Sequence, residues 1–304
     1  MKVGYSIIDI TPPIGIELCG YGCFLERKAE NVLDLLYARA VNLNDGNKKL
    51  LLINCDLVAL TESITRKVKK MLSDNFKIAE ECIMLLSTHT HTGPCPGKSM
   101  GIALGEPDEK YISLLTELLY EAGRTAVLNT REVKQARQFV RAIEPIGYNR
   151  ADPQGSVDNS LHGIAFYFKE GKPLALVSHG CHPVTLGAST QISADYPGRV
   201  VRALSNKGFD GVFLTGFCGD IDPVSNLKKW GSGTSEVIDG YGERIANAFT
   251  EWVEKADPMD NMNLDAFEIP ISLELQCLKD DEIEKILKQS GKGKVDISPD
   301  QGLL

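Results

Sequence analysis

Four of the five histidines of this 304-residue chain form two close pairs. His89 and His91 follow the apolar run CIMLLST, and His179 and His182 follow the run PLALVS. A neutral imidazole is a common zinc ligand, and a second histidine beside it can position a substrate or transfer a proton. On an extended strand both rings of H-x-H would face one ligand, whereas a turn at residues 93–94 would separate their roles. The pattern predicts a metal or proton-transfer site.

Acidic residues near these histidines are candidates for further metal ligands or for a general base. They are Asp195, Asp220 and Asp222, and each could instead cap a helix or accept loop amides. Zinc brings the pKa of a bound water down to about 7, which suits attack on a carbonyl at neutral pH. The Asp220/Asp222 pair leaves open a second interpretation, a Mg²⁺- or Mn²⁺-dependent ester or phosphate hydrolase.

Thiol chemistry is a further alternative, because Cys95, Cys181 and Cys218 lie near the predicted site in the sequence. A cysteine beside a histidine can be activated as a nucleophile. The eight cysteines contain no C-x-x-C pair, and we expect reduced thiols rather than a disulfide framework.

The histidines need strands to position them. Residues 49–56 and 82–88 are apolar runs typical of buried strands, and the intervening segment 61–74 has the pattern of an amphipathic helix with Thr61 as N-cap. Two buried strands joined through a helix predict a parallel βαβ unit. Ligands bind beyond the carboxyl ends of such strands, where His89 and His91 would lie.

The remaining pattern predicts an α/β fold with a mixed, largely parallel sheet layered with helices. Further helices are expected over 108–129, 195–208 and 235–256, and further strands over 3–9, 36–43 and 134–144. A hairpin is expected over 163–180, turning at 170–171, and residues 211–223 are expected to form a short buried strand followed by a Gly-rich, acidic loop. We expect a catalytic domain over 1–257. Residues 258–304 are expected to form a strand (265–274) and charged helix (278–290) as an appendage.

Composition narrows the class of protein. The chain is 43% hydrophobic and 24% charged, and its net charge of −8 argues against a nucleic-acid surface. Asp9 and Pro12 interrupt any signal-like run, and no apolar run approaches the roughly 20 residues that span a bilayer. We expect a cytoplasmic protein without stable membrane insertion; the oligomeric state stays open.

Several stretches, in order, resemble the N-terminal catalytic region of the neutral, non-lysosomal ceramidases. STHTHTGP resembles the family's T-H-T-H-S-G-P, and GYNRADP resembles its N-R-S-P loop. HPVTLGASTQISADYPG resembles its H-x-T-S-M and I-S-x-D-x-x-G stretch, and GFCGDIDP resembles its G-D-V-S-P stretch. The resemblance covers roughly residues 3–225.

This resemblance implies zinc-dependent hydrolysis of an N-acyl amide bond. It implies that His89 and His182 are zinc ligands, that His91 lies beside the reacting carbonyl, and that Arg150 contacts the substrate. The chain departs from the family at Asp222, where the family has a serine, and we expect this carboxylate to act in catalysis.

The family's remaining zinc ligands, a glutamate and a tyrosine, lie beyond the matched region, so either the chain is truncated relative to the family, or Asp220, Asp222 or another chain completes the site. We expect Asp220 to complete the metal site. The substrate is then expected to be a soluble N-acyl compound rather than ceramide, and a non-catalytic homologue that binds a ligand is the remaining alternative.

Overall fold

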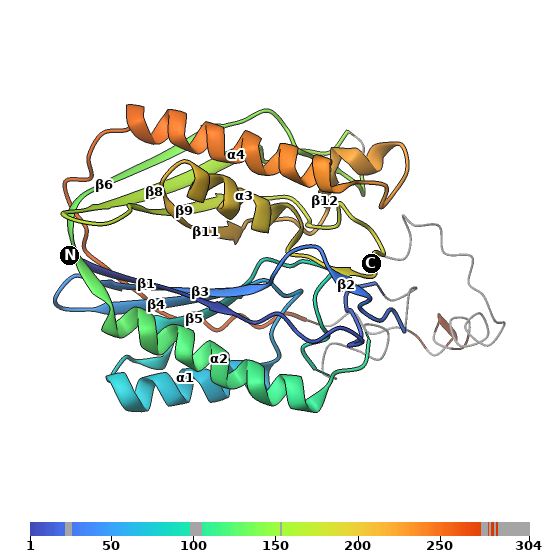
Figure 1. Cartoon of the computed structure of the whole chain (residues 1–304), viewed down its shortest axis with the longest axis horizontal. Helices are drawn as coiled ribbons and strands as arrows, with labels where there is room; N and C mark the ends of the chain where they lie inside the picture. The colour runs from blue at the N-terminus through green and yellow to red at the C-terminus, as the bar shows by residue number, and fades with distance from the viewer. Residues whose placement is uncertain are drawn as a thin grey trace.

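The computed structural model describes residues 1–21, 26–97, 105–152, 154–274, 279, 281, 282 and 284. An eight-stranded sheet, in the order β11-β9-β8-β6-β1-β3-β4-β5, folds back on itself so that its two halves face each other between two layers of helices (Figure 1). The α/β class predicted from the sequence is confirmed. The arrangement has four layers, with helices outside and strands inside.

The first half of the sheet is covered by α1 (Glu62–Phe76) and α2 (Glu109–Leu128) (Figure 1). Its strands are β1 (Lys2–Asp9), β3 (Tyr37–Asn44), β4 (Lys49–Cys55) and β5 (Ile83–Ser87). The expected βαβ unit is present, since β4 and β5 pair in parallel and α1 connects them. The short 3-10 turn η1 (Glu80–Cys82) lies between α1 and β5. Thr61 caps α1 as expected, accepting a bond from the amide of Ile64.

The second half is covered by α3 (Asp195–Asn206) and α4 (Ser235–Lys255) (Figure 1). Its strands are β6 (Thr130–Ala142), β8 (Ser160–Phe168), β9 (Leu174–His179) and β11 (Asp210–Thr215). The expected hairpin is present as the antiparallel pair β8/β9. A second βαβ unit joins β9 to β11 in parallel through α3.

The expectation of a largely parallel sheet is wrong. Among the described strands of the eight-stranded sheet, only β4/β5 and β9/β11 pair in parallel. Short connections such as those between β3 and β4 and between β8 and β9 leave no room for a crossover, so they join antiparallel neighbours. The sheet is mixed and mostly antiparallel.

Three apolar cores hold the layers together. One lies between the first half of the sheet and α1/α2, the second between the second half and α3/α4, and the third between the two halves. Across the gap between the halves, the Asn54 side chain donates to the Phe213 carbonyl at 2.7 Å, and Thr215 Oγ1 donates to the Thr88 carbonyl at 2.7 Å. The carboxyl ends of β5 and β11 are thereby joined.

Two two-stranded sheets accompany the eight-stranded sheet among the described residues. Strand β2 (Asn31–Val32) pairs with β10 (Gln191–Ile192), and β7 (Gly147–Asn149) pairs with β12 (Ile221–Pro223), which leads into the turn η4 (Val224–Leu227). Among the described helices, none is both long enough and apolar enough to cross a bilayer.

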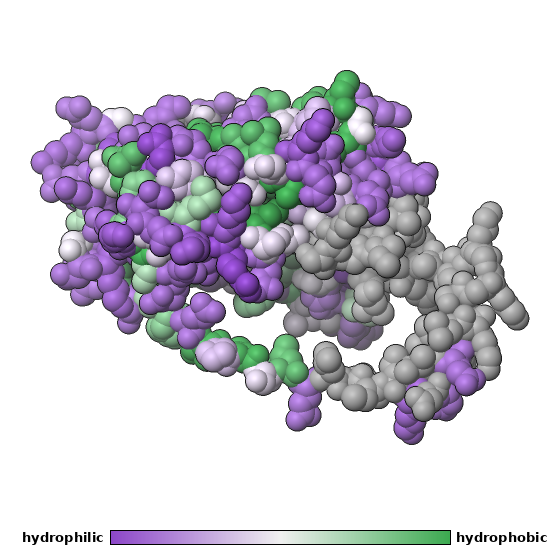
Figure 2. Space-filling model, turned by 90° about the horizontal axis from the view of Figure 1, so that it is seen from below, coloured by the Kyte–Doolittle hydropathy of each residue, from purple (hydrophilic) through white to green (hydrophobic). Residues whose placement is uncertain are grey.

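The segment after α4 differs from its prediction. Met259 donates its amide to the Ala136 carbonyl of β6, so this part lies along the sheet. Residues 265–274 form no strand, although Phe267, Ile269, Ile271 and Leu273 alternate as a strand would; these four are 66–84% exposed. Figure 2 shows this segment standing off the main body. The expected strand is wrong because no neighbouring strand pairs with it among the described residues, and most of 278–290 lies outside them.

Candidate metal centre

The histidine loop begins where β5 ends, at Ser87. Its start is tied to β4 and the segment after it, because Thr88 donates its amide to the Cys55 carbonyl and His89 donates to the Leu57 carbonyl, both at 2.9 Å. His89 has φ +69°, a left-handed conformation that is uncommon outside glycine. The loop is therefore not an extended strand, and tertiary contacts hold it in a strained backbone.

The threonines of T-H-T-H-T fix the loop to the segment that leads into α3. The hydroxyls of Thr90 and Thr92 both donate to the Ser193 carbonyl at 2.8 Å, and Ser193 donates its amide to the Thr92 carbonyl at 3.1 Å. All of these side chains are buried. The alternating threonines thus hold the histidine loop against the buried Ser193 segment.

His182 comes from the other half of the sheet. It follows the end of β9, and its amide donates to the Ile221 carbonyl of β12 at 2.8 Å. Its Nδ1 lies 3.1 Å from the Cys218 carbonyl. The ring therefore lies just beyond the carboxyl end of β9, and the loop that follows β11 holds it in place.

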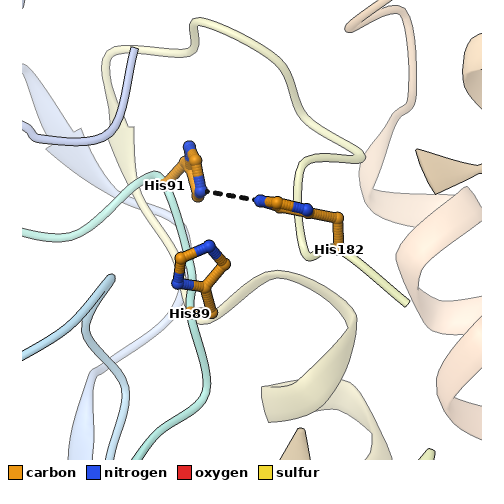
Figure 3. Close-up of side chains that lie close together, drawn as sticks. All are labelled: His89, His91 and His182. Atoms are coloured by element: carbon orange, nitrogen blue, oxygen red, sulfur yellow. Dashed lines mark hydrogen bonds between the residues drawn. The ribbon is translucent and has the colours of Figure 1, made fainter. Parts of the chain in front are cut away.

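The three rings converge (Figure 3). The ring centroids of His89, His91 and His182 lie 4.6 to 5.0 Å apart. Their ligand nitrogens all lie within 4.8 Å of one another, and Nε2 of His91 is 3.2 Å from Nε2 of His182. The structure thus brings together His89 and His182, which are 93 positions apart in the sequence.

The hydrogen bonds decide which nitrogens carry protons. Nδ1 of His89 lies 2.6 Å from the Val58 carbonyl, and Nδ1 of His182 lies near that of Cys218. A carbonyl only accepts, so both Nδ1 atoms are protonated and both Nε2 atoms keep a lone pair. Nε2 of His91 faces Nε2 of His182 at 3.2 Å, and a hydrogen bond with the Gly20 backbone raises the pKa of His91.

Burial keeps all three rings neutral at pH 7. It is the largest cause that lowers the pKa of His89, His91 and His182, the last to about 3. The charge that either neighbouring ring would carry lowers the pKa of His91 further. Neutral imidazoles are the form that binds metal.

The residues fit a zinc ion. Two of the rings have the outer Nδ1–H···O=C bond that orients metal-ligating histidines. Ligand nitrogens on one tetrahedral zinc, each about 2.0–2.1 Å from the ion, lie roughly 3.4 Å apart, and the ligand nitrogens of the three rings all lie within 4.8 Å of one another. Three buried imidazoles form a donor set typical of zinc and other first-row metals.

The predicted catalytic residues Arg150 and Asp222 form a pair. Nη1 of Arg150 lies 3.2 Å from Oδ1 of the buried Asp222, and Nη2 donates to the Gly219 carbonyl at 2.6 Å. The Arg150 charge lowers the pKa of both His89 and His182, so the guanidinium lies near the cluster.

Asp220 lies elsewhere. Its side chain is exposed, and Oδ2 accepts a bond from Asn149 at 2.8 Å. It is not a member of the histidine cluster found among the described residues. The backbone of Asp220 does contribute, because its carbonyl accepts the amide of Arg150 at 2.8 Å.

The other candidates of the sequence lie outside the cluster. Buried Asp195 accepts the amides of Leu186 and Tyr196, and burial raises its pKa to about 6. His179 lies near the Ser160 carbonyl, at 3.0 Å. Asp195 therefore accepts hydrogen bonds from backbone amides, which is the alternative to metal binding that the sequence left open for this residue.

The thiols nearest the centre are not activated. Burial raises the pKa of Cys181, and it raises that of Cys218 to about 11. The pKa of Cys95 is lowered to about 7, mainly by a hydrogen bond with Cys19 rather than by a histidine. Nucleophilic thiol chemistry at the histidines is therefore disfavoured.

Sequence reasoning missed a group of residues beside His91. The Tyr21 ring lies 4.8 Å from the His91 ring and 5.1 Å from that of Trp230, and the Arg27 guanidinium lies over Tyr21 at 5.0 Å. Tyr21 and Arg27 are close in the sequence, but His91 and Trp230 lie far from them along the chain, so only the fold brings the group together.

Comparisons with known proteins agree with this geometry. Residues 1–103 match the family model described as neutral/alkaline non-lysosomal ceramidase, N-terminal. No curated protein matches the chain. Two solved structures share the fold, each with a TM-score of 0.72 over 84% of this chain. One is neutral ceramidase from Pseudomonas aeruginosa, 20% identical, and the other is a ceramidase complexed with C2, 19% identical.

The chain spans 44% of the length of each of those two chains. The family model covers the segment that carries His89 and His91. The resemblance to the neutral/alkaline non-lysosomal ceramidases is confirmed, by sequence over residues 1–103 and by fold over most of the chain.

Proposed function

We propose that the protein is a zinc-dependent hydrolase that cleaves an N-acyl amide bond. The observation that carries the proposal is the convergence of three neutral histidine rings from two βαβ units, with their ligand nitrogens within 4.8 Å of one another. The family match over residues 1–103 supports the reaction class. When bound, zinc would supply a Lewis acid that polarises a carbonyl and lowers the pKa of water.

In this proposal His89 and His182 hold the zinc. Both rings have Nδ1 tied to a backbone carbonyl, which aims Nε2 into the cluster and fixes the tautomer. His91 lies beside the reacting carbonyl. In this proposal Nε2 of His91, which faces Nε2 of His182, carries the proton that is donated to the negative charge developing on the substrate oxygen.

Arg150 and Asp222 have a joint role. The buried Asp222 carboxylate and the Gly219 carbonyl hold two different nitrogens of the guanidinium, which fixes its orientation near the cluster. We propose that Arg150 contacts the substrate oxygen and that Asp222 orients it. Asp220 as a metal ligand stays a prediction that its exposed position and its bond to Asn149 do not support.

We further propose a soluble N-acyl compound as the substrate. The test is elemental analysis after exhaustive dialysis, followed by assays of the zinc-loaded protein on N-acyl amino acids and on short-chain ceramides. We expect one zinc per chain and faster hydrolysis of the soluble amides. Preference for the ceramides would overturn the substrate class, and failure to retain zinc would overturn the metal centre.

The role of His91 has its own test. His91→Ala should keep zinc and lose most of kcat, because a donor to the transition state is removed while both anchored ligands remain. His89→Ala should lose the metal. If His91→Ala also loses zinc in the same dialysis, His91 is a third ligand.

A further inference from the structure

Arg27 is a buried arginine at the edge of the histidine centre. Arg27 is only 6% exposed, and its guanidinium donates to three backbone carbonyls. Nη2 donates to His91 at 2.6 Å and to Cys19 at 3.0 Å, and Nη1 donates to Ser189 at 2.6 Å. One side chain thus joins the histidine loop to two other loops.

The other two buried arginines have a different environment. Arg39 pairs with Asp56 at 2.8 Å, and Arg199 pairs with Asp34 and Asp239, both at 2.8 Å. In the described part of the chain, Arg27 forms no such ion pair. A buried cation is costly unless it is hydrogen-bonded, and here backbone carbonyls accept bonds from both Nη1 and Nη2 of Arg27. The arrangement links main chains rather than neutralising a carboxylate.

The same residue supports the ring of His91 from the side. The guanidinium lies 5.0 Å from the centroid of the Tyr21 ring, and the Tyr21 ring lies 4.8 Å from the His91 ring. Gly20 closes the other approach, because a Cβ at this position would lie 2.6 Å from Nδ1 of His91. Arg27 therefore acts on His91 twice, through its carbonyl and through the packing of its ring.

His91 depends on the segment that Arg27 holds in a way that its two neighbours do not. His89 and His182 each have Nδ1 near a backbone carbonyl, at 2.6 and 3.1 Å, which orients the ring directly. The partner of the His91 ring is the backbone of Gly20, and the ring also packs against Tyr21. Gly20 follows Cys19, whose carbonyl accepts a bond from Arg27, so the orientation of the His91 ring depends on that segment.

We propose that Arg27 is a positioning residue for His91, acting through the His91 main chain and the Tyr21 ring. The catalytic part of this inference rests on the proposed amide hydrolysis, but the structural part does not. In the metal-free protein, Arg27 keeps the His91 ring in one orientation and one tautomer.

The test compares Arg27→Met and Arg27→Lys with Arg199→Lys. Arg199 is 5% exposed and serves as the matched control for loss of a buried guanidinium. Long-range ¹H–¹⁵N NMR of the imidazoles in metal-free protein reports the tautomer of each ring. In Arg27→Met we expect mixed tautomers at His91 and unchanged signals at His89 and His182, with Arg27→Lys intermediate.

Kinetics give the second readout. Loss of a supporting contact typically lowers activity by about 10–100-fold, and for Arg27→Met we expect this loss in kcat while KM changes little. Arg199→Lys should lower thermal stability and leave kcat and the NMR signals unchanged. Wild-type signals for His91 in both Arg27 variants, or the same disturbance in Arg199→Lys, would overturn the proposal.

These outcomes separate the two hypotheses. If the wild-type protein hydrolyses no N-acyl amide, the proposed function fails, and the NMR comparison still decides the role of Arg27. If Arg27→Met does not fold, Arg27→Lys, which keeps the charge but lacks the planar fork that reaches three carbonyls, gives the same comparison.

Discussion

His89 combines its proposed role as a metal ligand with a backbone conformation that costs free energy. A non-glycine residue at positive φ stores about 1–3 kcal/mol, and the φ of His89 is +69°. The strain is tolerated because the amide is bonded to Leu57 and the ring to Val58. Ligand placement and stability are therefore opposed at this position.

This opposition predicts a difference between two variants. His89→Gly and His89→Ala both remove the imidazole, but glycine relieves the left-handed backbone. We expect metal-free His89→Gly to be more stable than His89→Ala by about 1 kcal/mol, measured by urea denaturation. Equal stabilities would show that the backbone relaxes in the alanine variant.

Substitutions of the two neighbouring aspartates, Asp220 and Asp222, should have very different effects on activity. Asp222 is buried against Arg150, whereas Asp220 is exposed and bonded to Asn149. We expect Asp222→Asn to lower kcat/KM by about 10–100-fold without loss of zinc. Asp220→Asn is the control and should leave both zinc content and kcat/KM close to wild type. Loss of zinc in Asp220→Asn would establish Asp220 as a ligand.

At the scale of elements, the helices that cover the sheet depend unequally on their caps. Asp108 caps α2, with Oδ1 accepting the Tyr111 amide at 2.9 Å, whereas Thr234 at the start of α4 makes no such bond. Loss of an N-cap bond typically costs about 1 kcal/mol. We expect this loss in Asp108→Ala and a much smaller one in Thr234→Ala, by chemical denaturation. A similar loss in both would mean that the caps are not the cause.

Two βαβ units form the site, and neither is sufficient alone. The β4-α1-β5 unit ends at the histidine loop. In the β9-α3-β11 unit, His182 follows β9, and the Cys218 carbonyl that holds its ring follows β11. The contact of Thr215 with the Thr88 carbonyl joins them at this edge. The histidine cluster therefore depends on the packing of one half of the sheet against the other.

At the scale of the whole molecule, the buried histidines determine how stability depends on pH. An unfolded imidazole titrates near its ordinary pKa of about 6.5, whereas burial lowers the pKa of all three folded rings. Below pH 6.5 the unfolded chain binds more protons than the folded chain, so the stabilisation present above pH 6.5 is lost as the pH falls. For His182 the loss extends toward about pH 3.

Asp195 acts in the opposite sense, because its folded pKa of about 6 is raised by burial. Its contribution is present below the ordinary value and lost as the pH rises through about 6. Three histidines outweigh one carboxyl group. We therefore expect the free energy of unfolding of the metal-free protein to rise between pH 4.5 and 7, measured by urea denaturation.

His182→Asn is the control for this profile, since its amide keeps a donor for the Cys218 carbonyl but does not titrate. The variant should show a shallower rise with pH. A profile of the wild-type protein that is flat, or that falls toward pH 7, would contradict the neutral state of the histidines.

Local sequence determined much of the framework. Periodic apolar runs predicted the four helices and the strands of both βαβ units, and Thr61 predicted the start of α1, because such signals depend on neighbouring residues. They could not predict strand direction across the whole sheet. The alternation at 265–274 misled for the same reason, since a strand exists only where another strand pairs with it.

The sequence alone also determined which residue types could bind a metal, and the spacing of His89, His91 and His182 at strand ends predicted a site. Only the tertiary structure decided that these rings meet, that His179 and Asp220 lie outside the cluster, and that Arg27 and Tyr21 border it. The physical reason is that coordination and burial depend on distances of a few ångströms between segments that the chain itself places far apart, and packing between the two halves of the sheet sets those distances.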